Sequence, residues 1–390
     1  MHTNQLKVAL VHDWLLTDRG GERVLRALCE MFSGAPIFTL FHKKGSVDKT
    51  IESHPIQTSF LDRIPGAHRF HRHLLPLFPL AIERLVLEDF DLVISSSHCV
   101  AKGVIVPPDT VHISYTHTPM RYAWDRYHDY FDGRTEPLLA PVLHYLRQWD
   151  VTASARVDHF VANSNWVKAR ILKYYRRNSE VVFPFVDLNT FSISERKRDG
   201  YYLVVSAFAP YKRIDLALEA CRKLDRRLVV VGTGQDNRLL RKLGRKKVEF
   251  LGNLESTQLT SLYQNASALL FPGEEDFGIT PLEAMAAGTP VIAFGRGGVM
   301  DSVVPNRTGI LFPRQSVESL SEAIEDFESG IHTITPKACR AQAELFSEER
   351  FKREIAQVVK YAMSGDSGDS VQPPERRTPS FQTESQPPMT

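Results

Sequence analysis

Short apolar runs alternate with amphipathic segments along most of this 390-residue chain. Residues 7–11, 160–163 and 201–206 have the length and apolar character of buried strands. The segments at 23–31 and 213–224 instead repeat apolar residues at helical spacing. Strands and helices that alternate with short turns between them are typical of a doubly wound parallel sheet. The pattern therefore predicts an α/β protein.

The alternation is interrupted near residues 187–200 by a polar linker and then restarts. We therefore expect two Rossmann-like domains, at residues 1–187 and 198–345. The cleft between two such domains is the usual place for a ligand. A helix is predicted at residues 346–363. Residues 364–390 are rich in Ser, Pro, Gln and Glu and almost free of aliphatic residues, which predicts a disordered tail.

Composition narrows the class of protein. The formal net charge of +2 lacks the basic excess of a nucleic-acid binder. The four cysteines are far apart and include no CxxC pair, which disfavours both a zinc site and a disulfide framework. We find no run near the ~20 apolar residues of a membrane span and no signal-peptide pattern at the start. These features predict a cytoplasmic protein.

One stretch, residues 267–294, combines a buried strand, an acidic loop, a helix and a second strand. Thr280, Pro281 and Glu283 have the spacing of a helix start in which Thr280 is the N-cap and Glu283 completes a capping box. The loop before that helix follows the carboxyl end of a strand. In an open α/β sheet this is where anionic ligands bind.

The acids of this stretch have two explanations each. The capping box accounts for much of Glu283, and part of the crowding of Glu274, Glu275 and Asp276 is complementation of the helix dipole. A carboxylate at Glu275 that faces the cleft would instead accept hydrogen bonds from sugar hydroxyls. Glu275 is therefore the stronger functional candidate.

Two other turns are candidate phosphate sites. Gly20 and Gly21 lie in the predicted turn between the strand at 7–11 and the helix at 23–31, where free backbone N–H groups would hold a phosphate. Lys212 lies between a strand end and a helix and would meet a phosphate as a point charge. Each turn also has a purely structural interpretation, as a tight turn or a solvated lysine.

Two further segments have open interpretations. Residues 64–80 mix basic and apolar residues with prolines, which favours a surface loop that packs on its own domain. The alternative is a patch that rests on a membrane surface or on a lipid-linked substrate. Residues 121–130 are rich in aromatic and polar groups, which suits either a carbohydrate acceptor wall or ordinary packing.

From about residue 6 to residue 363 the chain resembles the retaining GT-B-fold glycosyltransferases of family four. In that family the 271–293 stretch recurs as an acid–Phe–Gly loop followed by Pro-Leu-Glu-Ala-Met-Ala-Gly-Pro-Val. Six shorter segments share the resemblance, namely residues 11–15 (VHDWL), 20–22 (GGE), 117–125 (HTPMRYAWD), 163–164 (NS), 210–213 (PYKR) and 297–299 (GGV). The resemblance implies a GT-B fold whose helix at 346–363 crosses back to the first domain.

The resemblance also implies roles for residues of the second domain. Glu275 would contact hydroxyls of the transferred sugar, Glu283 the nucleotide ribose, and Lys212 the diphosphate, with Arg213 as a second cation. The backbone amides of four consecutive residues would hold the sugar and the diphosphate at the helix start: Phe277, Gly278, Ile279 and Thr280.

In the first domain, Gly20 and Gly21 would approach the phosphate and the acceptor, and His117 would lie near the transferred sugar. The implied chemistry is glycosyl transfer with retention through an oxocarbenium-like transition state. Its main electrostatic requirement is stabilisation of the departing nucleoside diphosphate. Lys212, Arg213 and the helix dipole would meet that requirement, so no metal is expected.

One position departs from the family pattern. The family usually has an arginine five residues before the phosphate lysine, where this chain has Ala207. One lost charge-assisted contact would remove ~1.5–3 kcal/mol of leaving-group stabilisation. Either Arg213 or another cation compensates, or the protein turns its donor over slowly, or it binds the donor without transferring it.

The flanking sequence looks most like the bacterial mannosyltransferases that build surface polysaccharide or lipopolysaccharide from GDP-mannose. The resemblance thus implies a mannosyltransferase with a lipid-linked or oligosaccharide acceptor, working at the cytoplasmic face of the membrane. A different donor of the UDP-glucose type is one alternative. A catalytically weak nucleotide-sugar-binding partner in an assembly complex is the other.

Overall fold

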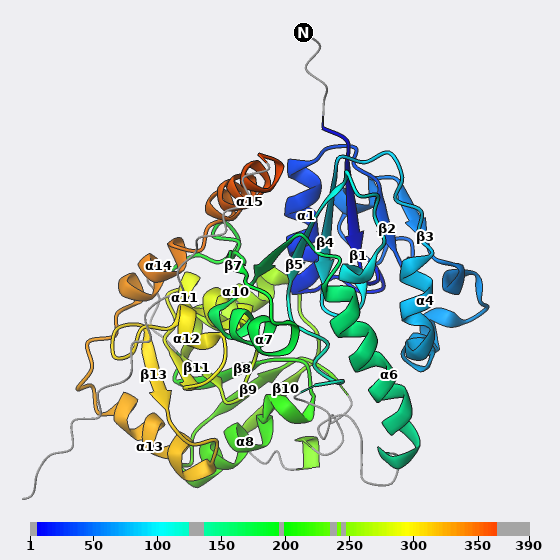
Figure 1. Cartoon of the computed structure of the whole chain (residues 1–390). Helices are drawn as coiled ribbons and strands as arrows, with labels where there is room; N and C mark the ends of the chain where they lie inside the picture. Colours follow the sequence, from blue (N-terminus) through cyan, green and yellow to red (C-terminus); the bar gives the residue numbers. More distant parts are fainter. Residues whose placement is uncertain (1–5, 125–135, 195–198, 235–239, 243–246, 365–390) are drawn as a thin grey trace, which may run out of the picture.

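The computed structural model describes residues 6–124, 136–194, 199–234, 240–242 and 247–364, and the chain forms two α/β lobes (Figure 1). The tail at 365–390, the middle of the linker at 195–198 and much of the aromatic segment at 121–130 lie outside the described residues. No helix in the described part of the chain is long and apolar enough to cross a membrane.

The first lobe contains a parallel sheet of seven described strands in the order β3-β2-β1-β4-β5-β6-β7. The strands are β1 Val8–His12, β2 Ile37–Thr39, β3 Ile56–Thr58, β4 Leu92–Ser97, β5 Val111–Thr116, β6 His159–Ala162 and β7 Glu180–Val181. The helical segments are α1 Gly20–Met31, α2 Lys49–Glu52, η1 Phe60–Arg63, α3 Ala67–Phe70, η2 His71–Leu77, α4 Phe78–Glu83, η3 Ala101–Gly103, α6 Glu136–Ser154 and α7 Asn165–Tyr175.

The second lobe contains a parallel sheet of six described strands in the order β10-β9-β8-β11-β12-β13. They are β8 Tyr201–Val205, β9 Leu228–Val231, β10 Val248–Leu251, β11 Ala266–Phe271, β12 Val291–Phe294 and β13 Gly309–Phe312. The helical segments are η4 Pro210–Lys212, α8 Ile214–Lys223, α10 Ser256–Asn265, α11 Ile279–Ala286, α12 Val299–Ser302, α13 Val317–Glu328 and α14 Pro336–Glu344. Both sheets are parallel and doubly wound, so the predicted fold class is confirmed.

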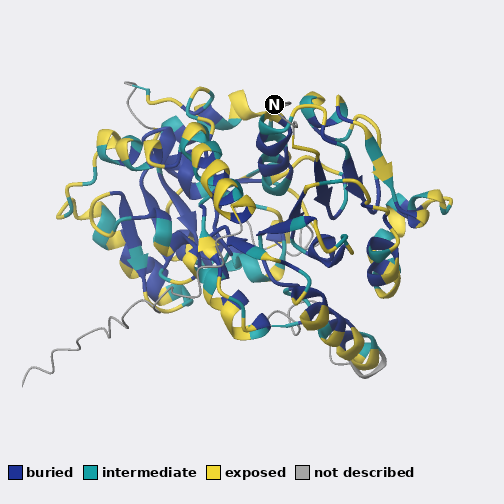
Figure 2. Ribbon diagram, turned by 45° about the horizontal axis from the view of Figure 1, so that its top comes forward, coloured by how far each residue is buried: buried dark blue, intermediate teal, exposed yellow. Residues whose placement is uncertain are grey.

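Each sheet lies inside its lobe with helices on both faces (Figure 2). Every residue of β1, β4, β9 and β12 is buried. Parallel strands that are covered on both faces read as continuous apolar runs rather than alternating ones. This is why the apolar runs identified the strands.

The last described helix, α15 (Glu348–Met363), leaves the second lobe and packs on the first, beside α1 (Figure 1). Phe351 and Ile355 join the core cluster that contains the β1 residue Leu10. The Phe351 ring lies 5.7 Å from the ring of Tyr115 on β5. Arg26 of α1 also donates to Glu348 at 2.9 Å.

Three local predictions need correction. Helix α1 begins at Gly20, so both glycines are its first residues and not part of the preceding turn. Glu22 takes part in this start, because its Oε2 accepts the backbone N–H of Arg19 at 3.0 Å. The segment at 64–80 is mostly a series of short helical turns rather than a loop, and α14 was not predicted.

The packing of α15 generates a stability prediction. Phe351→Ala removes a fully buried ring between α15 and the first sheet, so we expect a loss of ~3–5 kcal/mol in the free energy of unfolding. Denaturant unfolding followed by circular dichroism measures it. Gln357→Ala, at an exposed position of the same helix, is the control and should change stability by less than ~0.5 kcal/mol. Equal effects of the two changes would contradict this role for Phe351.

Candidate active site between the two domains

The two domains meet where the segments after β8 and β11 of one sheet contact the segments after β1 and β5 of the other. Gly20, at the start of α1, illustrates how close they come. A Cβ atom added to Gly20 would lie 2.8 Å from Cδ1 of Ile279, the first residue of α11. The starts of two helices from different domains therefore face each other across this junction, and a side chain at position 20 would require the Ile279 side chain to shift.

The acidic loop, residues 273–278, connects β11 to α11. Gly278 has a φ of 84° and is the N-cap of α11, which begins at Ile279. Thr280 is therefore inside the first turn and is not the N-cap, and no side chain caps this helix. The predicted capping box of Thr280 and Glu283 is wrong, because the left-handed glycine turns the chain into the helix two residues earlier.

Glu283 instead points to the first domain. Its Oε1 accepts a hydrogen bond from Arg23 Nη1 at 2.6 Å, and its Oε2 accepts one from Tyr263 at 3.0 Å. The Glu283 side chain is only 4% exposed. Arg23 belongs to α1, so this buried carboxylate is paired with a cation from the opposite domain.

The structure brings Glu275 and Lys212 together. Lys212 Nζ forms an ion pair with Glu275 Oε1, although 63 positions separate the two residues in the sequence. The loop also lies directly on the turn that carries the lysine, because a Cβ atom on Gly273 would be 2.9 Å from Lys212 Cα. Both side chains are largely buried, with exposed fractions of 13% for Lys212 and 20% for Glu275.

The Gly297-Gly298 turn after β12 supports the acidic loop from behind. Gly298 N donates to the Glu275 carbonyl at 2.9 Å. Cβ atoms on Gly297 and Gly298 would lie 2.5 Å and 2.1 Å from the carbonyl oxygens of Glu275 and Asp276. Larger residues at these two positions would displace the acidic loop, so the glycine pair allows the loop to pack directly on this turn.

Asp276 connects the domains as well. Its Oδ1 accepts from Arg170 Nη1 at 2.5 Å and from Thr118 Oγ1 at 3.3 Å, and its Oδ2 pairs with Arg121. These three partners belong to the first domain. Sequence reasoning treated Asp276 only as dipole complementation, and nothing in the local pattern identified its distant partners.

His117 lies at the end of β5 on the first-domain side of the junction. Its Nε2 is hydrogen-bonded to Ser96 Oγ at 2.8 Å, and the same hydroxyl is 3.1 Å from His12 Nδ1. Burial, and next the charge of His98, lower the pKa of His117 to about 3, so the imidazole is neutral at physiological pH. A Cβ atom on Gly21 would be 3.7 Å from His117 Nε2.

Asp13 organises the same first-domain side of the junction, which we call the first-domain wall. Its two oxygens accept hydrogen bonds of 2.6–2.9 Å from four consecutive backbone N–H groups, those of His98, Cys99, Val100 and Ala101. It also pairs with His98 Nδ1 at 2.9 Å. Burial opposes ionisation, but the charge of His98 and these hydrogen bonds hold the pKa of Asp13 below its usual value. Asp13 follows β1 directly, a position that could have marked it.

The remaining residues predicted to be at the donor site make other contacts in this structure. Arg213 donates to its neighbour Asp215, with Nη2 2.9 Å from Oδ2, so in this structure it serves the start of α8. Phe277 is buried and stacks on Phe183, with 6.0 Å between ring centroids. Ala207 is exposed just beyond the end of β8. No group of three or more metal-ligating side chains is found within the described residues.

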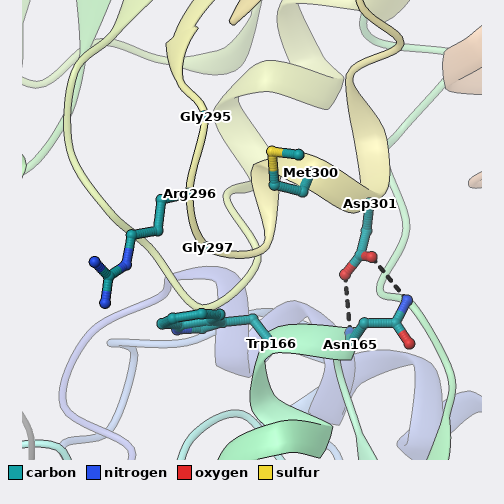
Figure 3. Close-up of a pocket in the computed structure, with 7 residues that line it drawn as sticks. All are labelled: Asn165, Trp166, Gly295, Arg296, Gly297, Met300 and Asp301. Carbon is teal, nitrogen blue, oxygen red and sulfur yellow. Dashed lines mark hydrogen bonds between the residues drawn. The ribbon is translucent and has the colours of Figure 1, made fainter. Parts of the chain in front are cut away.

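A cavity of about 310 Å³ opens beside the Gly297-Gly298 turn (Figure 3). Its walls come from both domains: Asn165, Trp166, Gly295, Arg296, Gly297, Met300 and Asp301. The guanidinium of Arg296 lies 5.4 Å from the Trp166 ring centroid. Asn165 donates from its backbone N and its Nδ2 to the carboxylate of Asp301, at 2.9 and 2.7 Å. These contacts form a further interdomain connection.

Two family models match the chain in succession. Glycosyltransferase Family 4 matches residues 19–190, and Glycosyl transferases group 1 matches residues 186–345. Their junction coincides with the linker between the two lobes.

Curated relatives include several mannosyltransferases. Alpha-1,3/1,6-mannosyltransferase ALG2 of Candida glabrata is 28% identical over 281 residues, which cover 55% of this chain and 61% of that protein. The human protein of the same name is 30% identical over 242 residues, 52% of this chain and 58% of the relative. A GDP-mannose-dependent alpha-mannosyltransferase of Mycolicibacterium smegmatis is 42% identical over 117 residues, which cover 29% of this chain and 31% of that protein. The matches thus span less than two thirds of these relatives.

Solved structures match over a larger share of the chain. Sucrose-phosphate synthase from Thermosynechococcus elongatus has a TM-score of 0.72 at 18% identity and covers 92% of this chain and 100% of its own. Anabaena HepE, solved in complex with UDP-glucose, has a TM-score of 0.67 at 15% identity, with coverage of 91% and 99%. At these identities the likeness shows the shared fold.

The Asp13 cluster generates a stability prediction. Asp13→Asn leaves His98 and the turn after β4 without a charged partner, so we expect a loss of ~3–5 kcal/mol at pH 7. The difference from wild type should shrink progressively as pH falls below 3.8, the ordinary pKa that Asp13 regains in the unfolded state, and it is fully lost only below the lowered folded-state pKa. Denaturant unfolding between pH 3 and 7 measures it. Asp91→Asn, at an exposed position, is the control, and an equal loss there would contradict the assignment.

Proposed function

We propose that this two-domain GT-B glycosyltransferase transfers mannose from GDP-mannose to a hydroxyl group of a lipid-linked or oligosaccharide acceptor, with retention of the anomeric configuration. The observation that carries the proposal is the pairing of Glu275 with Lys212 in front of the α11 start, at the junction of the domains. The choice of mannose and GDP follows the names of the curated relatives.

The donor's diphosphate would lie between Lys212 and the first turn of α11. Lys212 supplies a point charge, and the amides of Gly278, Ile279 and Thr280 face the place where an anion is stabilised by a helix start. The Phe277 amide belongs to the same turn. Glu275, once its lysine turns to the phosphate, accepts hydrogen bonds from sugar hydroxyls.

The ribose would bind at Glu283. Its carboxylate is the acceptor for the two ribose hydroxyls, and Tyr263 keeps its orientation from the buried side. Arg23 occupies this carboxylate in the present structure, so nucleotide binding exchanges the Arg23 contact for hydroxyl donors. Gly20 and Gly21, at the start of the same helix as Arg23, would approach the phosphate from the first-domain side.

In the transfer step the acceptor oxygen forms a bond to the anomeric carbon, and the bond from that carbon to the diphosphate oxygen breaks. The bonding electrons leave with the nucleoside diphosphate, and the acceptor proton passes to its phosphate oxygen. Lys212 and the helix start stabilise the charge that develops on this leaving group. A neutral His117 beside the sugar accepts or donates a hydrogen bond without repelling the positive charge of an oxocarbenium-like transition state.

The acceptor would approach over the first domain from a membrane surface. The segment at 60–86 exposes five apolar residues, Phe60, Phe70, Leu77, Leu80 and Val86, and the basic residues Arg63, Arg69, Arg72 and Arg84. This mixture fits the interface of an anionic bilayer. Trp14 connects the segment to the site, because its ring lies 5.8 Å from His71 and 4.5 Å from His98. The proposal thus places the enzyme on the cytoplasmic face of a bacterial membrane, in polysaccharide or lipopolysaccharide synthesis.

A second candidate is the same transfer from a UDP-sugar. HepE, whose fold this chain shares, was solved with UDP-glucose. A further alternative is that the protein is a weakly catalytic nucleotide-sugar-binding partner. It is suggested by Ala207, because a cation would then be missing from the diphosphate site.

Removal of the Glu275–Lys212 pair tests the activity. With GDP-mannose, UDP-glucose and other nucleotide sugars as donors, we expect Glu275→Ala and Lys212→Ala each to lower kcat/KM or slow donor hydrolysis by roughly 10²–10³-fold. The loss for Lys212→Ala should depend on the diphosphate of the donor, and the loss for Glu275→Ala should depend on its sugar. Glu274→Gln, in the same loop but paired with Arg296, is the matched control. Unchanged turnover of every donor in both variants would refute the site.

Membrane contact is tested by liposome co-sedimentation. Because each arginine near an anionic surface contributes ~1 kcal/mol, Arg69→Ala/Arg72→Ala should weaken binding to vesicles that contain phosphatidylglycerol by about thirtyfold. Both side chains are exposed. The control is Arg222→Ala/Lys223→Ala on α8 of the second domain, which removes the same charge elsewhere. A loss of equal size in both double variants would show nonspecific charge attraction instead of a defined membrane surface.

A further inference from the structure

Arg121 is a cation at the domain junction to which neither the sequence motifs nor the comparisons assign a role. We propose that Arg121 of the first domain binds the donor's diphosphate together with Lys212 of the second domain, in place of a cation that position 207 does not supply. This inference rests on the proposed function, because it requires a nucleoside diphosphate in the interdomain site.

Arg121 and Lys212 converge on one aromatic ring. The guanidinium carbon of Arg121 lies 5.3 Å from the centroid of Tyr211, and Lys212 Nζ lies 5.2 Å from the same centroid. Arg121 follows β5 in the first domain, whereas Tyr211 and Lys212 form η4 in the second. Two cations from opposite domains therefore both lie close to the Tyr211 ring at the junction.

The partners of the two cations are also neighbours. Lys212 pairs with Glu275, and Arg121 pairs with Asp276, the next residue of the acidic loop. A diphosphate carries more negative charge than either carboxylate and offers several acceptor oxygens. It would compete with both acids for both cations at once. A guanidinium also matches phosphate geometry with two parallel N–H donors, which an ammonium group lacks.

Asp276 keeps its other partners when Arg121 turns to the phosphate. Arg170 Nη1 stays 2.5 Å from Asp276 Oδ1, and Thr118 donates to the same oxygen. The two arginines also differ in exposure, since the Arg170 side chain is 7% exposed and that of Arg121 is 21% exposed. Arg170 is thus the buried structural partner, and Arg121 is the one that a ligand reaches.

A diphosphate held by both cations would join the two domains. Lys212 moves with the second domain and Arg121 with the first, so bound diphosphate favours the closed arrangement in which both reach it. Nucleoside diphosphate binding and domain closure are then one coupled equilibrium. A nucleoside monophosphate engages fewer phosphate oxygens and should produce less of this coupling.

The test compares GDP with GMP on the full-length protein by isothermal titration calorimetry. Loss of a charge-assisted contact of this kind corresponds to a roughly 10- to 100-fold change in Kd. We therefore expect Arg121→Ala to weaken GDP binding by that factor and GMP binding by less than about threefold. Arg121→Lys should give an intermediate Kd for GDP, and Ala207→Arg in the Arg121→Ala background should recover most of the loss.

The outcomes separate the two proposals. If Arg121→Ala weakens GDP and GMP equally, or if Asp276→Asn reproduces the selective loss of GDP binding, Arg121 acts through the interdomain ion pair and this inference is overturned. If wild type binds GDP and UDP but Arg121→Ala binds them equally well, only this inference fails. If wild type binds no nucleoside diphosphate, the proposed function fails with it. Retained GMP binding and an unchanged melting temperature establish that the variants are folded.

Discussion

Charge pairing across the domain junction is the interaction on which this site depends. Asp276 is buried in the acidic loop of the second domain, yet its partners Arg170 and Arg121 come from the first. An uncompensated buried carboxylate costs several kcal/mol, so separation of the domains would have to expose Asp276 to water or leave it unpaired. The same carboxylate fixes the loop on one side, and the Gly297-Gly298 turn fixes it on the other. The position of Glu275 follows from these two constraints.

The candidate site is therefore already filled by the protein's own charges. Glu275 is engaged by Lys212, Glu283 by Arg23, and Asp276 by two arginines. A nucleotide sugar would exchange these partners: its phosphates take the cations, and its hydroxyls donate to the released carboxylates. Such an exchange trades one set of charge-assisted hydrogen bonds for another, so its net free energy is smaller than the sum of the new contacts. Selectivity then depends on how well a ligand matches the positions of both sets.

Much of the fold and part of the site could be predicted from the sequence. The strands were readable because parallel strands covered on both faces are continuous apolar runs. Glu275 and Lys212 each lie in the short connection between a strand and the next α-helix. The capping box failed because Thr280 and Glu283 have the spacing of a true box, while the side chain of Glu283 is held by Arg23, 260 positions away. Asp276 was missed for the same reason. Local spacing does not contain a contact made across a domain boundary.

In the first-domain wall, two histidines have pKa values shifted in opposite directions. His98 beside Asp13 has a raised pKa, because the carboxylate outweighs the burial that lowers it, whereas His117 has its pKa lowered by burial and by the charge of His98. His98, whose charged form is favoured by Asp13, thus anchors the turn after β4, and its charge lowers the pKa of His117. For glycosyl transfer this division is useful. In the proposed reaction a neutral imidazole at position 117 would let positive charge develop on a sugar nearby, and the cations of the site would stabilise the departing diphosphate. In that reaction, a neutral His117 on one side and Lys212 and Arg121 near Tyr211 on the other would set the direction in which the bond from the anomeric carbon to the diphosphate is polarised.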